Sequence, residues 1–169
     1  ILTNDGDDQW ATYVEGEVRV GPGDKITSET LAGAKERCHQ EFDVEAHYGE
    51  LAGVHIEWGP LWSWTEAVLG GDDDAGGLVQ LTPPEDMEVG NLPLHPVAID
   101  NGFAASRIGV VKNEEDSTPQ LPFAVERVQW FQPPSRSVWC SNRAVELGDE
   151  NSRFDLIFWD DAGEVVAVI

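Results

Sequence analysis

Residues 94–103, which read LHPVAIDNGF, constrain the fold of this chain more than any other part of the sequence. Pro96 fits the first turn of a helix, because the N–H group that proline lacks would have no helical partner there. We therefore predict a helix from about Pro96 toward Ile108. Small side chains in this helix leave room for a sheet to wrap closely around it: Gly102, Ala104 and Ala105. A helix with such a surface is typically buried.

Asp100 is the carboxylate within this apolar segment, one turn into the predicted helix. Burial disfavours the charged form of a carboxyl group and raises its pKa, which suits the group to transfer a proton near neutral pH. A carboxylate near a helix N-terminus can instead lie at the surface and stabilise the helix dipole. The residue type alone leaves both interpretations open.

The length and charge of the chain limit what it can be. With 169 residues and 41% hydrophobic content, we predict one domain, residues 1–169, with its own core. The net charge of −22, from 32 acidic and 10 basic residues, argues against nucleic acid or an anionic membrane as partners. The acidic clusters are typical of solvated loops, which favour solubility, and the acidic excess also fits a protein adapted to salt. None has the spacing of an EF-hand, so we expect no metal site.

Cys38 and Cys140 are about a hundred residues apart, and neither has a second cysteine nearby. This spacing argues against a zinc site or a redox pair and predicts buried free thiols in a reducing compartment. We see no apolar run of membrane-spanning length and no signal peptide, so we expect a cytoplasmic protein. The first residue is Ile1 rather than methionine, which fits a segment of a longer polypeptide.

The remaining pattern predicts an antiparallel sheet. Apolar residues occupy even positions from Trp10 to Val20, which is the period of a strand with one buried face. The other expected elements are helices at Thr30 to Cys38 and Val44 to Ala52, a hairpin of Ser63 to Leu69 with Leu78 to Thr82, and late strands at Ala124 to Phe131, Ser137 to Leu147, Phe154 to Trp159 and Val165 to Ile169. The last hairpin turns at Asp161-Ala162-Gly163. An antiparallel sheet wrapped around a long central helix is an α+β hot-dog fold.

Several short motifs in this order resemble the C-terminal half of the dehydratase domain of modular polyketide synthases. The opening segment WATYVEGEVRV, the tyrosine-containing helix FDVEAHYGELAG and the closing segment FDLIFWDDAGEVVAV are each similar to segments of that family. The tyrosine-glycine-proline signature of the family is matched by Trp58-Gly59-Pro60, with an aromatic residue following at Trp62. The similarity covers nearly the whole chain.

Two further motifs extend the resemblance. The family's helix motif, His-Pro, three residues, then Asp, is matched by His95, Pro96 and Asp100. The leucine-proline-phenylalanine signature is present as Leu121-Pro122-Phe123. The resemblance implies one half of a double hot dog, with Asp100 as its catalytic residue. It also implies substrate contacts from the matched motifs and the helix: His95, Pro96, Trp58, Gly59, Pro60, Trp62, Ala104, Leu121, Pro122 and Phe123.

In the family, the aspartate works opposite a histidine of the N-terminal hot dog, within the signature His, three residues, Gly, four residues, Pro. That signature is absent from this sequence, so we expect the chain to supply half of an active site. We expect His39, His47 and His55 to be solvated or capping residues. We expect His95 to be a helix-start residue packed under the sheet rather than a general base.

The sequence departs from the family at the residue four positions after the aspartate. That residue is usually glutamine or histidine and hydrogen-bonds the carboxylate, but here it is Ala104. Asp100 is then differently oriented, or held by Asn101 or by a water molecule. Trp58 and Trp62 reshape the space over the helix. The seven tryptophans fit either an aromatic-walled cavity or a plain aromatic core.

The resemblance implies elimination of water from a 3-hydroxyacyl thioester carried on the phosphopantetheine of an acyl carrier protein, with no bound cofactor. The expected partners are this carrier protein and the N-terminal hot-dog half or a second copy in a homodimer. Two other functions stay open. One is a double-bond isomerase or pyran-forming cyclase, favoured by Ala104, and the other is a non-catalytic hot-dog scaffold, favoured by the missing histidine.

Overall fold

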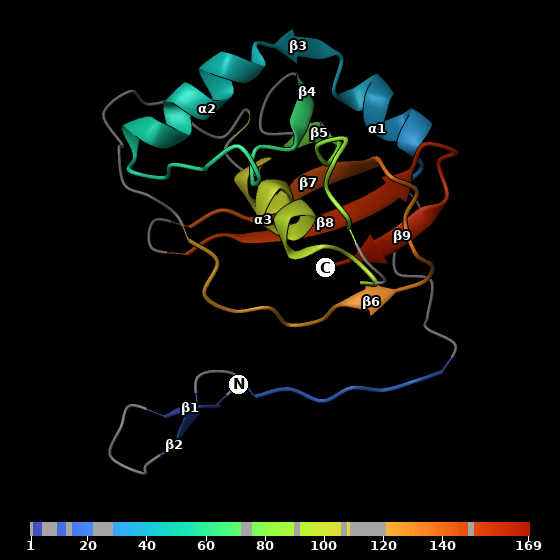
Figure 1. Cartoon of the computed structure of the whole chain (residues 1–169). Helices are drawn as coiled ribbons and strands as arrows, with labels where there is room; N and C mark the ends of the chain where they lie inside the picture. The colour runs from blue at the N-terminus through green and yellow to red at the C-terminus, as the bar shows by residue number, and fades with distance from the viewer. Residues whose placement is uncertain are drawn as a thin grey trace.

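The computed structural model describes residues 2–4, 10–12, 15–21, 29–71, 76–89, 92–105, 108, 121–148 and 151–169 (Figure 1). Its central feature is a seven-stranded sheet in which all neighbouring strands are antiparallel, in the order β3-β4-β5-β7-β8-β9-β6. The strands are β3 Gln40–Phe42, β4 Thr65–Gly70, β5 Gly77–Leu81, β6 Gln129–Trp130, β7 Val138–Glu146, β8 Arg153–Asp160 and β9 Val165–Val168. Short β3 was not expected, because its three exposed residues carry no apolar pattern.

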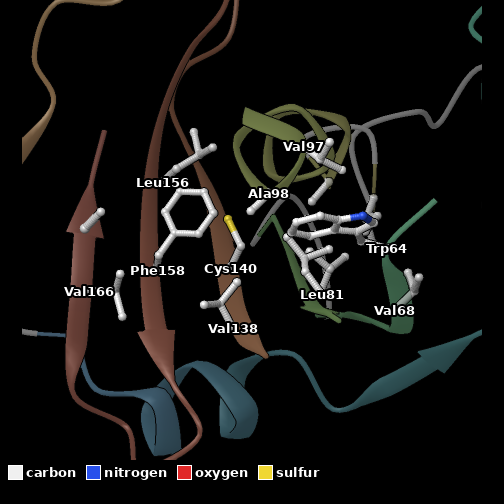
Figure 2. Close-up of a cluster of buried hydrophobic side chains, with 14 residues drawn as sticks. Trp64, Val68, Leu81, Val97, Ala98, Val138, Cys140, Leu156, Phe158 and Val166 are labelled. Atoms are coloured by element: carbon white, nitrogen blue, oxygen red, sulfur yellow. The ribbon is translucent and has the colours of Figure 1, made fainter. Parts of the chain in front are cut away.

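Helix α3, Pro96–Ala104, packs on one face of this sheet, as a hot-dog fold requires. Figure 2 shows Val97 and Ala98 of α3 facing Cys140 of β7, Phe158 of β8 and Trp64. The helix is shorter than expected. It ends where the backbone N–H of Ala105 donates to the Asn101 carbonyl. Ile108 lies beyond the end of the helix and is buried in the core, 6% exposed.

The opposite face of the sheet is covered by helix α1, Leu31–Arg37. Neighbouring strand residues point to opposite faces of a sheet. Accordingly, Phe158 packs in the cluster that contains α3, whereas Trp159 packs with Leu31 and Ala34 of α1. The sheet is therefore buried on both faces.

Both early helices confirm the sequence prediction. Thr30 caps α1 by accepting a hydrogen bond from the Gly33 N–H (3.1 Å). Helix α2, Val44–Gly53, begins in the same way after Asp43, which accepts from the Ala46 N–H (2.7 Å). A polar N-cap residue satisfies a backbone N–H that has no partner inside the helix, and so fixes where the helix begins.

The predicted strand from Trp10 to Val20 is wrong as a single buried strand. Of the residues in this span that the structure describes, Trp10–Thr12 form strand β2, which pairs with β1, Leu2–Asn4, and residues 15–20 form no strand. Val18 and Val20 are 92% and 101% exposed. Alternation shows that one face of a segment is apolar, but it does not show that this chain contains the surface that covers it.

The predicted strand from Ala124 to Phe131 is shorter than expected for the same reason. Only Gln129–Trp130 pairs with β9, and residues 121–128 are exposed and form no strand. The other late strands and the hairpin at Asp161-Ala162-Gly163 confirm the prediction. Gly163 adopts φ +84° there, and the Asp160 carboxylate accepts hydrogen bonds from two backbone N–H groups of the turn.

Gly102 permits the close approach of α3 to the sheet. A Cβ atom at this position would lie 2.9 Å from both Cys140 Sγ and Phe158 Cζ, and 3.2 Å from Leu156 Cδ2. These distances are shorter than ordinary contacts, so any side chain here would push the helix and the sheet apart. Gly49, in the exposed face of α2, has no atom within 4 Å of its corresponding Cβ position.

We predict opposite effects of alanine at these two helical glycines. Gly49→Ala raises the free energy of unfolding by roughly 0.5–1 kcal/mol through helix propensity alone. Gly102→Ala gains the same propensity but overpacks the core at a cost of about 1–3 kcal/mol, so a net loss is expected. Urea denaturation of the 169-residue chain measures both. Equal stabilisation by the two substitutions would contradict the tight contact at Gly102.

Candidate active site on helix α3

The start of α3 is fixed by His95. Its Nδ1 accepts a hydrogen bond from the Val97 N–H (3.2 Å), and Pro96 occupies the first helical turn. The His95 ring lies on the Trp64 indole, with 4.8 Å between ring centroids and 31° between planes. Burial lowers the pKa of His95, which favours the neutral ring that can accept this bond. The structure thus places His95 at the helix start, as predicted.

Asn101 connects α3 to three other parts of the chain and is 1% exposed. Its Nδ2 donates to the Trp62 carbonyl (2.8 Å) and to the Val97 carbonyl (2.9 Å). Its Oδ1 accepts from the Thr65 hydroxyl (3.2 Å) and the Trp64 N–H (3.4 Å). Because its polar atoms are bonded to different elements, Asn101 fixes the rotation of α3 about its own axis.

Tyr48 of α2 completes this hydrogen-bond network. Its hydroxyl donates to Asn101 Oδ1 (3.4 Å) and accepts from the Thr65 N–H (3.0 Å). Its ring meets Trp58 edge to face, with centroids 5.8 Å apart and planes at 79°. Helix α2 therefore contacts both α3 and the loop that carries Trp58.

Asp100 precedes Asn101 and is half-buried. Burial raises the pKa of its carboxyl group, and a hydrogen bond from the Trp58 side chain opposes part of that rise. Asn101 does not hold this carboxylate, because its polar atoms bond elsewhere. The indole N–H of Trp58 supplies the contact instead.

The other predicted site residues in this region lie on α3 or in the loop that carries Trp58. Ala104 is half-buried one helical turn after Asp100 and has no side chain that can hydrogen-bond. Gly59 and Pro60 are exposed in the loop after Trp58, and Trp62 is 43% exposed while its carbonyl accepts from Asn101. The loop and the helix therefore place His95, Trp58, Trp62 and Ala104 on or beside α3.

The segment Leu121-Pro122-Phe123 is not brought to this site. Leu121 and Phe123 are 69% and 81% exposed, and their segment runs along the outside of the fold toward β6, apart from α3 (Figure 1).

The sequence suggested Asn101 only as a holder of Asp100, and it did not indicate that Asn101 and Tyr48 form a buried network. A signal for Asn101 was present, since it shares a helix face with apolar Val97 and Ala105. A polar side chain on such a face needs buried partners. Those partners come from the 62–65 segment and from α2, which no local pattern links to α3.

The other histidines differ in their surroundings. His39 is exposed, and His55 lies in an exposed turn with φ 64°. The prediction that His47 is a solvated or capping residue is wrong, because it lies inside α2 and is 6% exposed, beside Tyr48 with ring centroids 5.6 Å apart. Cys38 and Cys140 are buried free thiols, as expected, and burial raises the pKa of both. The described part of the chain contains no cluster of three or more His, Cys, Asp or Glu that could hold a metal ion. No described helix is long and apolar enough to cross a membrane.

Comparison with known sequences supports the dehydratase resemblance and does not show which half of that domain the chain represents. A family profile described as "Polyketide synthase dehydratase N-terminal domain" matches residues 26–169. The chain is 22% identical over 162 residues to "Polyketide synthase PksN" of Bacillus subtilis (strain 168), a match that covers 94% of this chain and 3% of that protein.

Solved structures show the same architecture. The dehydratase domain from the CurF module of curacin polyketide synthase has a TM-score of 0.79 and 20% identity, covering 98% of this chain and 58% of that chain. The dehydratase domain of RzxB from Pseudomonas fluorescens has a TM-score of 0.70 and 20% identity, covering 85% and 51%. The chain thus resembles the hot-dog architecture of these domains and spans about half of their length.

The raised pKa of Asp100 predicts a pH-dependent stability difference. A raised folded-state pKa means that the folded chain binds this proton more tightly, so the stabilising contribution is complete below the unfolded pKa of about 3.9 and is lost as pH rises through the folded pKa. We expect Asp100→Asn to gain stability relative to the unsubstituted chain between pH 4 and pH 8. Urea unfolding midpoints across this range test it, and a difference that is constant with pH would contradict the desolvated carboxyl group.

Proposed function

Since the chain belongs to the polyketide synthase dehydratase family, we propose that it is the aspartate-bearing, C-terminal half of a two-part dehydratase-type domain. The matching profile is described as an N-terminal domain, so the assignment to the C-terminal half rests on the His95-Pro96 helix start followed by Asp100. The chain's span of 50–58% of the CurJ and CurF dehydratase chains fits one of two halves.

The observation that carries the proposal is the half-buried carboxyl group on the helix at the centre of the fold. Burial makes Asp100 hold its proton to higher pH than a solvated aspartate, while the Trp58 side chain hydrogen-bonds it. Such a group is suited to donate a proton to a departing oxygen. The solved relatives include an inactive CurK dehydratase in which an aspartate is replaced by asparagine.

Elimination of water also needs a general base, and none of the recognised motifs of this chain supplies one. Solved inactive mutants of the CurJ and CurK dehydratases have a histidine replaced by phenylalanine. We propose that the N-terminal half supplies such a histidine opposite Asp100. The exposed apolar residues along the β6 edge fit association with that half or with a second copy: Leu121, Phe123, Val125, Val128, Trp130 and Phe131.

The proposed substrate is a 3-hydroxyacyl thioester on the phosphopantetheine arm of an acyl carrier protein. The histidine removes the proton from the carbon next to the thioester carbonyl. The electron pair left there forms the carbon–carbon double bond as the bond to the 3-hydroxyl breaks. Asp100 donates its proton to the leaving oxygen, so the products are an enoyl thioester and water. We propose no bound cofactor in this step.

Ala104 favours a second candidate function. The side chain that would reach Asp100 from the next helical turn is absent, which alters the surroundings of the acid. A double-bond isomerase or a pyran-forming cyclase on the same scaffold would use Asp100 with such altered surroundings. A non-catalytic scaffold is the third possibility and would leave Asp100 without a role in turnover.

We predict that Asp100→Asn, in the complete two-half domain, lowers turnover of a 3-hydroxyacyl thioester by about 10²–10⁴-fold, the range typical for loss of a general acid. Asn keeps the shape of the side chain but cannot donate an acidic proton. Formation of the enoyl thioester is followed by mass spectrometry of the carrier-bound acyl chain.

Asp161→Asn is the matched control, because Asp161 is exposed in the hairpin between β8 and β9. It is expected to retain full turnover. Supplying the enoyl thioester alongside the hydroxyacyl thioester separates the candidates, since an isomerase converts only the enoyl substrate. Unchanged turnover in Asp100→Asn would reject the proposed role of Asp100.

A further inference from the structure

We propose that Tyr48 is a positioning residue for Asp100, which it orients through Trp58 on one side and Asn101 on the other. The inference rests on the proposed function of Asp100 and adds the groups that hold this acid in place. Tyr48 lies on α2, and the two residues through which it acts lie in the 58–64 loop and on α3.

The Asn101 contact controls the direction in which α3 presents its side chains. Asp100 and Asn101 are adjacent, so a rotation of α3 that moved one would move the other. The Tyr48 hydroxyl is held by the Thr65 N–H at 3.0 Å and reaches Asn101 Oδ1 at 3.4 Å. Asn101 is in turn bonded to the Trp62 carbonyl at 2.8 Å. The Tyr48 hydroxyl therefore links the rotation of α3 to the fixed start of β4.

The Trp58 contact controls the carboxyl group itself. The edge-to-face packing with the Tyr48 ring, at 5.8 Å between centroids, braces the Trp58 indole. An indole N–H can donate a hydrogen bond but cannot accept one. When Asp100 is protonated, its carbonyl oxygen is the stronger acceptor for this N–H, so we expect the proton on the other oxygen.

This arrangement gives Asp100 a defined side from which to donate. A glutamine or histidine one turn along the helix could either donate to the carboxyl group or accept from it, but Ala104 does neither. The orientation of Asp100 then depends on Trp58, and the position of Trp58 depends on Tyr48. The contacts of Tyr48 with Trp58 and Asn101, and of Trp58 with Asp100, replace the hydrogen bond that a side chain at position 104 would make.

Two substitutions separate the two contacts. Trp58→Phe keeps an aromatic ring against Tyr48 but removes the N–H donor to Asp100. Tyr48→Phe keeps the ring that braces Trp58 but removes the hydroxyl that reaches Asn101. The matched control is Trp139→Phe, because Trp139 packs on the opposite face of the sheet, under Lys35.

The first readout is the pKa of Asp100, followed by carbon-13 NMR of the carboxyl groups of the 169-residue chain and assigned with Asp100→Asn. The Trp58 hydrogen bond favours the charged form, so Trp58→Phe is expected to raise the pKa of Asp100 further. Tyr48→Phe and Trp139→Phe are expected to leave it unchanged. An unchanged pKa in Trp58→Phe would overturn the Trp58 contact.

The second readout is the pH dependence of kcat in the complete two-half domain. Because Asp100 must be protonated to act, Trp58→Phe moves the alkaline limit of kcat to higher pH and lowers its maximum about tenfold or more through misorientation. Tyr48→Phe lowers kcat without moving that limit. A kcat in Tyr48→Phe equal to that of Trp139→Phe would overturn the Asn101 contact.

Failure of this inference is distinguishable from failure of the proposed function. If Asp100→Asn keeps full turnover, the proposed function fails, while the pKa measurement still tests the Trp58 contact. If Asp100→Asn is inactive but Trp58→Phe and Tyr48→Phe behave like the control, only the positioning role fails. Circular dichroism of each variant shows whether the fold is retained, and Trp58→Phe still tests the Trp58 contact if Tyr48→Phe does not fold.

Discussion

The buried amide of Asn101 is the interaction on which the rest of the site depends. Its five hydrogen bonds reach four parts of the chain: α2, the loop before β4, the start of β4 and the first turn of α3 itself. A buried amide that lost these partners would leave unpaired polar groups in the core, at a cost of about 1–3 kcal/mol each. This cost selects one rotation of α3. That rotation directs Gly102 into the sheet and Asp100 toward Trp58.

The two sides of α3 therefore have different roles in the fold, and only the role of the buried side could be predicted from local sequence. The buried side needs small and apolar residues, and the pattern around Gly102 predicted it correctly. For Asp100 the sequence left a buried and a surface carboxyl group open, and the structure supports the buried one, with a raised pKa. Its orientation was not predictable, because Trp58 and Tyr48 belong to elements more than 40 residues earlier in the chain. Asp100 could therefore be predicted as the acid, whereas the roles of Trp58 and Tyr48 in orienting it could not.

A similar distinction explains which elements of the fold were predicted. Signals contained within a few residues succeeded, such as the capping of α1 by Thr30 and the turn at Gly163. Apolar alternation alone failed where nothing in the described chain covers the apolar face. Val18, Val20 and the residues before β6 are exposed for this reason. A strand needs a partner as well as an apolar pattern.

The central claim, that Asp100 donates the proton to the leaving oxygen, is tested most directly by a crystal structure of the complete two-half domain. The domain would hold a pantetheine-linked 3-hydroxyacyl amide, which keeps the hydroxyl but resists turnover. The account predicts the 3-hydroxyl oxygen at about 3 Å from Asp100, on the carboxyl oxygen that does not accept from Trp58. An acyl chain seated with its hydroxyl away from Asp100, and Asp100 turned into solvent, would contradict it.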